Sequence, residues 1–499
     1  MNKSLSWNIL FLTGRLLLNL LASLYISKEV LHVLGVTDYG IFTVVNSTVL
    51  LMTILTGSFS TAVSRFINVE KGKGNGDRVN SIYTISLLLH IAFSFIILVL
   101  LYYFSDFLIY ELLTIPKERQ TVAETILFIS SLNLVWILLG VTFVSLIISN
   151  EDMKSYSIIG VMEIFLKLIG VYLLVNIPIE KLVLHMSILS TISFVILLVY
   201  IVYCKLRYQR VRLTRDYRLD EVSNLFRFIG WNLVGNISFV VKEHGVNILI
   251  NVFFGSGVNA AKGLAYQVVS SIQMLFSNVT LATNPRITQL YSSGRQDDAL
   301  RLALNFTRYM FCFAVLFSVL VIFNRDVFLA YWLDSVPEYT SDFLKLMTLN
   351  LLIECISGPL ITLLLAIGNI RNYQILVGGV NGLNLPIGYL ALNLGYDVYS
   401  VFYTSILISL LCFSLRVVLI AKNYSIQITY FLYQFKGVLI TLFLVFYWVF
   451  YSGLSHGENI DINYIISLLS IVFSFSLVSF FIVLSRDERI SLIKLVVRK

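Results

Sequence analysis

Charged residues are scarce in this chain. Only 13% of its 499 residues are Asp, Glu, Lys or Arg, whereas 58% are hydrophobic. A soluble domain needs more polar residues than this to cover its surface, so composition excludes that class. The apolar runs are about 20 residues long and show no alternation of period 2, which favours spanning helices over barrel strands of about 10 residues. The sequence therefore predicts an all-α, polytopic membrane protein.

The motifs of catalysis and of cofactor binding are also missing. The chain has no nucleophile elbow and no HExxH, and its GKGNGD segment (residues 72–77) lacks the strand and the GK[ST] ending of a phosphate loop. Four cysteines show neither CxxC nor paired spacing, so no disulfide and no metal site is predicted. We therefore expect a protein that is not an enzyme and uses no cofactor or metal.

The basic residues indicate an orientation in a membrane. A net charge of +8 could attract nucleic acid, but the bases lie between apolar spans, so we predict no nucleic-acid partner. Arg207, Arg212 and Lys422 belong to one set of loops, and Asp106 and Asp326 to the other. The basic set should be cytosolic. About fourteen spans can be placed, an even number, so both termini should be cytosolic as well.

The first twelve spans divide into two sixes that repeat one another after about 220 residues. Gly35 pairs with Gly255, and the segment 106–118 with 326–339. Six spans per copy give both copies one orientation, with the substrate site between them. The expected parts are an N-lobe (1–203, spans 1–6), a basic cytosolic linker (204–225), a C-lobe (226–420, spans 7–12), and spans 13 and 14 with a cytosolic tail (421–499).

Polar side chains form continuous faces on the two helices that open each half. In the helix over 226–254, Asn236, Glu243 and Asn247 share one face, with Lys242 and His244 beside it. Charge at that depth of a membrane is by default functional. We predict that spans 1, 2, 7 and 8 line a polar cavity, with the candidates Arg15, Asn19, Lys28, Asn46, Asn236, Lys242, Glu243, Asn247, Lys262, Gln273 and Asn284.

Structural interpretations compete with this cavity. Small polar residues also join neighbouring helices by hydrogen bonds, and Glu163 with Lys167, four residues apart, is interpreted as a neutralising structural pair. His90 and His185, near span ends, are interpreted as interfacial. His244, beside Glu243, is a candidate for a proton-linked group. Glu243, His244 and Glu354 are the candidates for coupling transport to an ion.

The motifs LGVTDYGIF, AVSRFI, NVFFGSGVNAAKGLAYQV and ATNPRI, in this order, resemble those of bacterial polysaccharide or oligosaccharide flippases. These form the Wzx-like branch of the multidrug/oligosaccharidyl-lipid/polysaccharide (MOP) superfamily. The resemblance extends from Leu10 to about Arg486 and includes the plan of two six-helix lobes plus two C-terminal helices.

The resemblance implies a flippase of the bacterial inner membrane. It would move undecaprenyl-pyrophosphate-linked repeat units to the outer leaflet by alternating access, for O-antigen, capsule or exopolysaccharide synthesis. The implied partners are this lipid-linked oligosaccharide, membrane lipid and the polymerase and chain-length proteins; a proton or sodium counter-ion is left open. Arg15, Lys28, Lys242 and Lys262 would bind the pyrophosphate.

Two other functions stay open. A multidrug exporter of the same superfamily, driven by sodium or protons, would use a carboxylate-lined cavity for organic cations, for which Glu243 and Glu354 are available. Arg15, Lys242 and Lys262 count against it. A membrane scaffold or a sugar polymerase is the third possibility, although a polymerase usually has a large outer loop, which this chain lacks.

Overall fold

The computed structural model describes residues 3–53, 76–150, 152–209, 211–214, 240–367 and 370–425, together with positions 63, 67, 70, 237, 238, 429, 436, 440, 443, 472–475 and 489. All regular elements in these ranges are helices, which confirms the all-α class. Nine of the described helical segments are long and apolar enough to cross a membrane. Predicted spans 13 and 14 lie almost wholly outside the described residues, as does Asn236.

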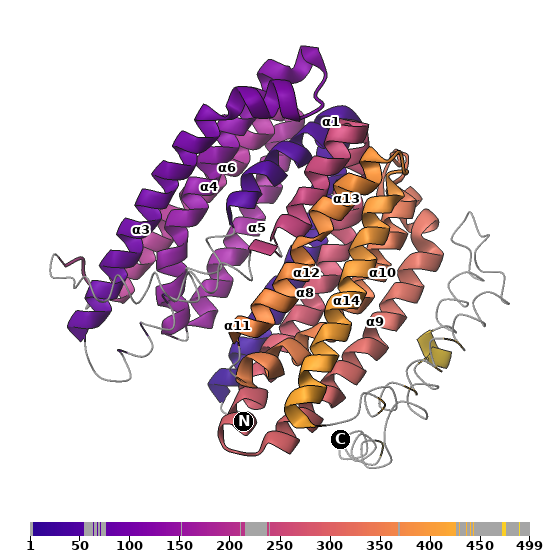
Figure 1. The fold of residues 1–499 in the computed structure, drawn as a ribbon. Coiled ribbons are helices and arrows are strands. Elements are labelled where there is room, and N and C mark those ends of the chain that lie inside the picture. The colour runs from indigo at the N-terminus through magenta and orange to yellow at the C-terminus, as the bar shows by residue number, and fades with distance from the viewer. Residues whose placement is uncertain are drawn as a thin grey trace. The chain divides into compact units, whose positions relative to one another are not determined.

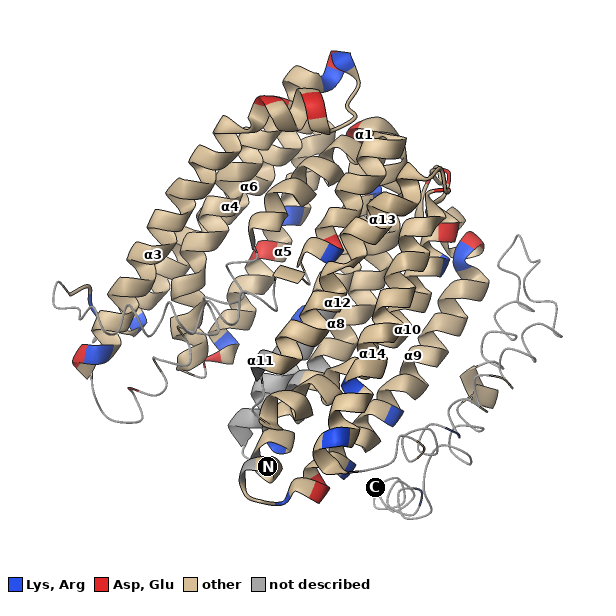
Figure 2. Ribbon diagram, viewed as in Figure 1, with Lys and Arg blue, Asp and Glu red and all other residues tan. Residues whose placement is uncertain are grey.

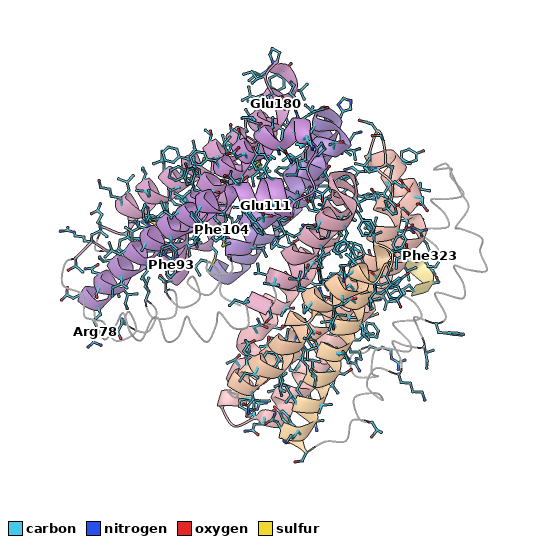
Figure 3. The ribbon with its side chains drawn as sticks, turned by 45° about the horizontal axis from the view of Figure 1, so that its top comes forward. Arg78, Phe93, Phe104, Glu111, Glu180 and Phe323 are labelled. Atoms are coloured by element: carbon cyan, nitrogen blue, oxygen red, sulfur yellow. The ribbon has the colours of Figure 1, made fainter. Side chains whose placement is uncertain are left out.

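The described helices carry apolar side chains on their outer surfaces. On α3 (Gly76–Tyr103), Leu88, Ile91, Phe95 and Val99 are all exposed. Figure 2 shows the charged residues mostly near helix ends, with long uncharged stretches between them. Figure 3 shows Arg78 at one end of α3 and Phe93 further along it. Lipid tails, rather than water, are the solvent for such a surface. The chain is therefore a multi-pass membrane protein.

The chain forms two compact units (Figure 1). Unit 1 comprises Met1–Gln267 and Leu385–Val398. It contains α1 (Lys3–Leu50), α3, α4 (Gln120–Ser149), α5 (Met153–Asn176) and α6 (Lys181–Arg207). The helix over 240–254 and the first part of α8 (Ser256–Ser292) also belong to it. The π-helix Phe107–Leu112 and the 3-10 helix Lys117–Arg119 connect α3 to α4, and a 3-10 turn, Leu51–Thr53, follows α1.

The core of unit 1 is built where α4 packs against α3 and α6, and where α1 packs against α5. Ile41, Ile109, Ile126 and Leu182 meet in one fully buried cluster. A second cluster contains Ile82, Phe143, Leu146 and Ile196. Burial of a side chain of this size contributes about 1.5–3 kcal/mol relative to water, although in a bilayer close packing supplies much of the attraction.

Unit 2 comprises Val268–Asn384 and Tyr399–Lys499. In it α10 packs against α9 and α14, and Leu304, Leu360, Leu363 and Ile420 are buried together. Its helices are the second part of α8 (Ser256–Ser292), α9 (Gln296–Trp332), α10 (Thr340–Ile367), α11 (Ile370–Tyr373), the π-helix Gln374–Gly378, α12 (Gly379–Gly382) and α14 (Tyr399–Tyr424), while α13 (Asn384–Asn393) returns to unit 1.

The predicted repeat has matching local geometry. Gly35 interrupts α1 with a φ of 74°, and Gly255 ends the helix over 240–254 with a φ of 81°. Left-handed backbone of this kind favours glycine. Leu113 and Leu333, also about 220 residues apart, are both buried and extended at the end of a helix. The lobe boundaries inferred from the repeat remain a prediction, since the compact units follow packing instead.

Two polar clusters join the connections of unit 1. Arg119 donates from Nε to Asp38 and from Nη2 to Glu180, both at 2.8 Å, and so links the α3–α4 and α5–α6 connections to α1. Asp152 caps α5 by accepting from the Ser155 amide at 3.3 Å, and it also accepts from the Tyr203 and Tyr208 hydroxyls. Burial would raise the pKa of Asp152, but these hydrogen bonds outweigh burial and lower it.

Replacing Asp152 with alanine should destabilise unit 1. The change removes a helix cap, worth about 1 kcal/mol, and the acceptor of two tyrosine hydroxyls, worth about 1 kcal/mol each. Thermal unfolding in detergent should occur at a clearly lower temperature for Asp152→Ala, and at an intermediate one for Asp152→Asn, which can still cap. Asp397→Ala, at an exposed position, is the control. Equal stability of Asp152→Ala and wild type would contradict this account.

Candidate functional site

The site is organised by a close crossing of two helices, the part of α1 after Gly35 and the first part of α8. A β-carbon at Gly40 would lie 1.7 Å from the Ser256 carbonyl oxygen. One at Gly263 would lie 2.9 Å from Thr43 Oγ1. Small residues let helix backbones approach in a bilayer. Thr43 and Gly263 are equivalent positions of the predicted repeat.

Charged residues lie next to this crossing, since Lys262 directly precedes Gly263 on α8. Lys262 is buried, its Nζ donates to the Glu243 carbonyl oxygen at 3.3 Å, and it lies 5.9 Å from the centre of the Tyr266 ring. It also interacts electrostatically with the Glu243 side chain and with His244. Lys242 is buried on the same helix as Glu243. The structure thus brings together Lys262, Glu243 and His244 from predicted spans 7 and 8.

Asn247 is the next polar group along this face. It is buried, and its Nδ2 donates to Ser47 Oγ. Asn46, which precedes Ser47 and was predicted to line the cavity, is half-buried. Asn247 Oδ1, and both amide atoms of the fully buried Asn259, have no hydrogen-bond partner among the described residues. Buried amide atoms of this kind are usually satisfied by ordered water or by a ligand.

The predicted residues of the first helix lie elsewhere in unit 1. Arg15 packs on α5: its guanidinium lies 4.4 Å from the centre of the Tyr156 ring, and it donates to the Tyr156 carbonyl at 3.4 Å. Gly160 leaves the room for it, since a β-carbon there would lie 2.1 Å from Arg15 Nε. Lys28 is half-buried, and Asn19 lines a cavity.

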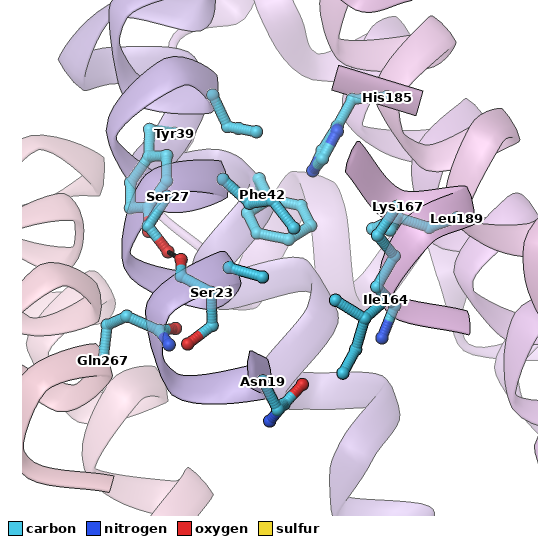
Figure 4. A pocket seen from close by; sticks show the side chains of 13 residues that line it. Asn19, Ser23, Ser27, Tyr39, Phe42, Ile164, Lys167, His185, Leu189 and Gln267 are labelled. Carbon is cyan, nitrogen blue, oxygen red and sulfur yellow. Dashed lines mark hydrogen bonds between the residues drawn. The ribbon is translucent and has the colours of Figure 1, made fainter. Parts of the chain in front are cut away.

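That cavity has a volume of about 210 Å³ and lies among α1, α5, α6 and the first part of α8 (Figure 4). His185 lines it, buried, with its ring 5.0 Å from that of Phe42. His90 is buried as well and hydrogen-bonded to the Ser86 carbonyl at 2.7 Å, so both histidines face other helices, while their interfacial depth remains a prediction. A hydropathy profile gives depth along a helix but not the facing helix.

Lys167 also lines the cavity. Its Nζ lies 2.7 Å from Glu163 Oε1, as the predicted i, i+4 pair requires. The remaining lining residues come from α1, α5, α6 and α8 and are mainly apolar or hydroxyl-bearing: Ala22, Ser23, Ile26, Ser27, Val30, Tyr39, Ile164, Leu189 and Gln267.

The other candidates belong to unit 2. Asn284 Oδ1 accepts from Thr362, and Glu354 Oε1 accepts from Ser409 at 2.9 Å. Gln273 is half-buried on α8. Arg416 was missed: it is buried in α14, where it donates to Ser357 Oγ at 3.0 Å and to the Tyr373 hydroxyl at 3.3 Å. An arginine inside an apolar span was the signal that could have found it.

Solved structures share this fold. One titled "Lipid II flippase MurJ, inward closed conformation" is 17% identical, covers 95% of this chain and 98% of its own, and has a TM-score of 0.67. Another, titled "Inward-facing conformation of a multidrug resistance MATE family transporter of the MOP superfamily", is 12% identical, covers 79% and 92%, and has a TM-score of 0.65. The chain therefore shares the fold of these two solved structures.

Two family models match the sequence. The model described as "Polysaccharide biosynthesis protein" matches residues 4–291, and the model "MatE" matches residues 233–390. The first covers more than half of the chain, which therefore belongs to the polysaccharide biosynthesis protein family. No curated protein matches the sequence. The predicted membership of the MOP superfamily is confirmed.

Proposed function

We propose that the protein is a flippase for undecaprenyl-pyrophosphate-linked oligosaccharides in the bacterial inner membrane, with both termini cytosolic. The family match over residues 4–291 carries the proposal. The buried cations Lys242 and Lys262 support it, because a pyrophosphate needs such groups at membrane depth whereas an organic cation would be repelled by them. The polymerase and chain-length proteins of the same polymer are the proposed partners.

We assign separate roles in substrate binding and in ion coupling to the residues of the site. Lys262 and Lys242 would hold the pyrophosphate, and the amides of Asn247 and Asn259 would bind water or sugar hydroxyls. Glu243 and His244, which both interact with Lys262, are our candidates for coupling to a proton or sodium ion. Glu354 is the corresponding candidate of unit 2, where it accepts from Ser409.

Deletion of the gene tests the proposal. Lipid-linked repeat units should accumulate on the cytosolic leaflet and surface polymer should fall, which mass spectrometry of lipid extracts and polymer staining would measure. The MatE match over 233–390 favours the one alternative, a cation-coupled multidrug exporter. Unchanged polymer together with increased drug sensitivity would establish that alternative instead.

Complementation with variants tests the cationic groups. Lys242→Ala and Arg15→Ala should each lower polymer export at unchanged protein level. Loss of a hydrogen bond to a charged group costs about 1.5–3 kcal/mol, or about 10- to 150-fold. The Arg15 effect should be the smaller, because its guanidinium is already engaged by Tyr156. Full export by both variants would refute the cationic site.

A further inference from the structure

Residues that line the cavity of unit 1 are equivalent, in the predicted repeat, to residues of the polar face that contains Lys262 and Asn247. Ser27 and Gln267, which both line the cavity, are the repeat equivalents of Asn247 and Ser47. The Asn247–Ser47 pair is closed by a direct hydrogen bond. Its equivalent borders about 210 Å³ of open space instead. Of the two places that the repeat relates, one is therefore filled by side chains and the other is open.

The cavity and the Lys262 group also differ in the charge of their equivalent residues. Lys262 and Glu243, which interact at the first place, correspond to Phe42 and Ser23 in the cavity. The cavity thus has an aromatic ring and a hydroxyl where its counterpart has an ammonium and a carboxylate. Lys167, the cation that remains, is neutralised by Glu163 at 2.7 Å. An ionic ligand would find no uncompensated charge among these groups.

Neutral hydrogen-bonding groups of α1 and α8 line the cavity, beside the ion-paired Lys167 of α5 and His185 of α6. Asn19, Ser23 and Ser27 recur every four residues on one face of α1, and Figure 4 shows the Gln267 amide opposite them. Ser23 and Ser27 donate to carbonyls of their own helix, at 2.9 and 2.8 Å, and Ser27 also pairs with the Tyr39 hydroxyl. The Ser23 oxygen is left as an acceptor for a ligand hydroxyl. The amides supply both donors and acceptors.

We propose that this cavity binds one sugar ring of the lipid-linked saccharide, an inference that rests on the proposed function. A neutral ring with many hydroxyls matches the amides and hydroxyls of α1 and α8, and its apolar face matches Phe42. The volume is below the 300–1,000 Å³ of pockets for drug-sized ligands, so it takes one ring rather than an oligosaccharide.

Binding of two lipids to the purified full chain in detergent tests the proposal. The probes are undecaprenyl pyrophosphate and the same lipid carrying one N-acetylglucosamine. Wild type should bind the sugar-bearing lipid about tenfold more tightly, as expected for one or two good hydrogen bonds. Asn19→Ala, and Ser23→Phe, which fills the cavity, should lose this difference. Gel filtration and thermal unfolding establish that both variants are folded.

Two matched controls lie outside the cavity. Asn393→Ala removes an exposed amide of unit 1, and Ser105→Phe adds the same ring to a different cavity of that unit. Both should keep the tenfold difference. Equal affinity of wild type for the two lipids, or a difference that survives in Ser23→Phe, would overturn the sugar site and leave the proposed function standing. Binding of neither lipid would overturn the proposed function, and the sugar site with it.

Discussion

Alanine at position 40 should prevent the protein from reaching its native fold in useful amounts. The added β-carbon would lie 1.7 Å from the oxygen and 2.5 Å from the carbon of the Ser256 carbonyl. Because both are backbone atoms, α1 and α8 would have to separate along the crossing that carries Thr43, Gly263 and Lys262. Overpacking of a well-packed interface costs about 1–3 kcal/mol, and more where backbone must move. Protein level in the membrane and thermal unfolding in detergent are the measurements.

Alanine substitutions at two other glycines serve as comparisons for Gly40→Ala. Gly140 is buried in α4, but nothing lies within 4 Å of a β-carbon placed there. Gly140→Ala should therefore be neutral, or stabilising by up to about 1 kcal/mol through helix propensity. Gly263→Ala should be intermediate, because the atoms it meets belong to the Thr43 and Tyr39 side chains, which can shift. If Gly40→Ala were as stable as Gly140→Ala, the close crossing would be wrong.

Methionine at position 262 should abolish most transport while leaving the fold intact. Methionine has nearly the length of lysine, and an apolar side chain in place of a buried ion is often neutral or stabilising. Loss of the ammonium from the group that contains Glu243 and His244 removes a cation available to the pyrophosphate. The cost of about 1.5–3 kcal/mol corresponds to about 10- to 150-fold slower export.

Complementation of the deletion strain measures this change, with polymer at the surface and lipid-linked intermediates as the two readouts. Lys345→Met, at an exposed lysine of α10, is the matched control and should export normally. Lys262→Arg should restore only part of the activity, because a guanidinium keeps the charge but differs in shape from the ammonium. Normal export by Lys262→Met at wild-type protein level would exclude Lys262 from the substrate site.

The sequence predicted most of the fold because local rules govern it. A helix in lipid must satisfy its own backbone hydrogen bonds, so long apolar runs can only be helices here. Gly35 and Gly255, paired by the repeat, do adopt the same left-handed backbone. Glu163 and Lys167 form their ion pair because they lie one turn apart on one helix. Each of these features depends on residues close together in the chain.

The candidate site was predicted only in part, because periodicity gives the face of a helix but not its neighbour. Lys262, Glu243 and Asn247 do come together, but Arg15, chosen for the same kind of reason, lies on the Tyr156 ring of α5. Asn247 bonds to Ser47, a residue that was not among the candidates.

The sequence by itself determined that this is a helical membrane protein, it predicted an internal repeat, and its motifs indicated the superfamily. Hydropathy, glycine positions and basic loops are enough for that, since each acts locally or along one helix. Only the tertiary structure decided that Gly40 meets the Ser256 carbonyl, and that His185 and Gln267 border one cavity. Residues more than 80 positions apart meet there because helices pack, and packing depends on the shapes of all of them together.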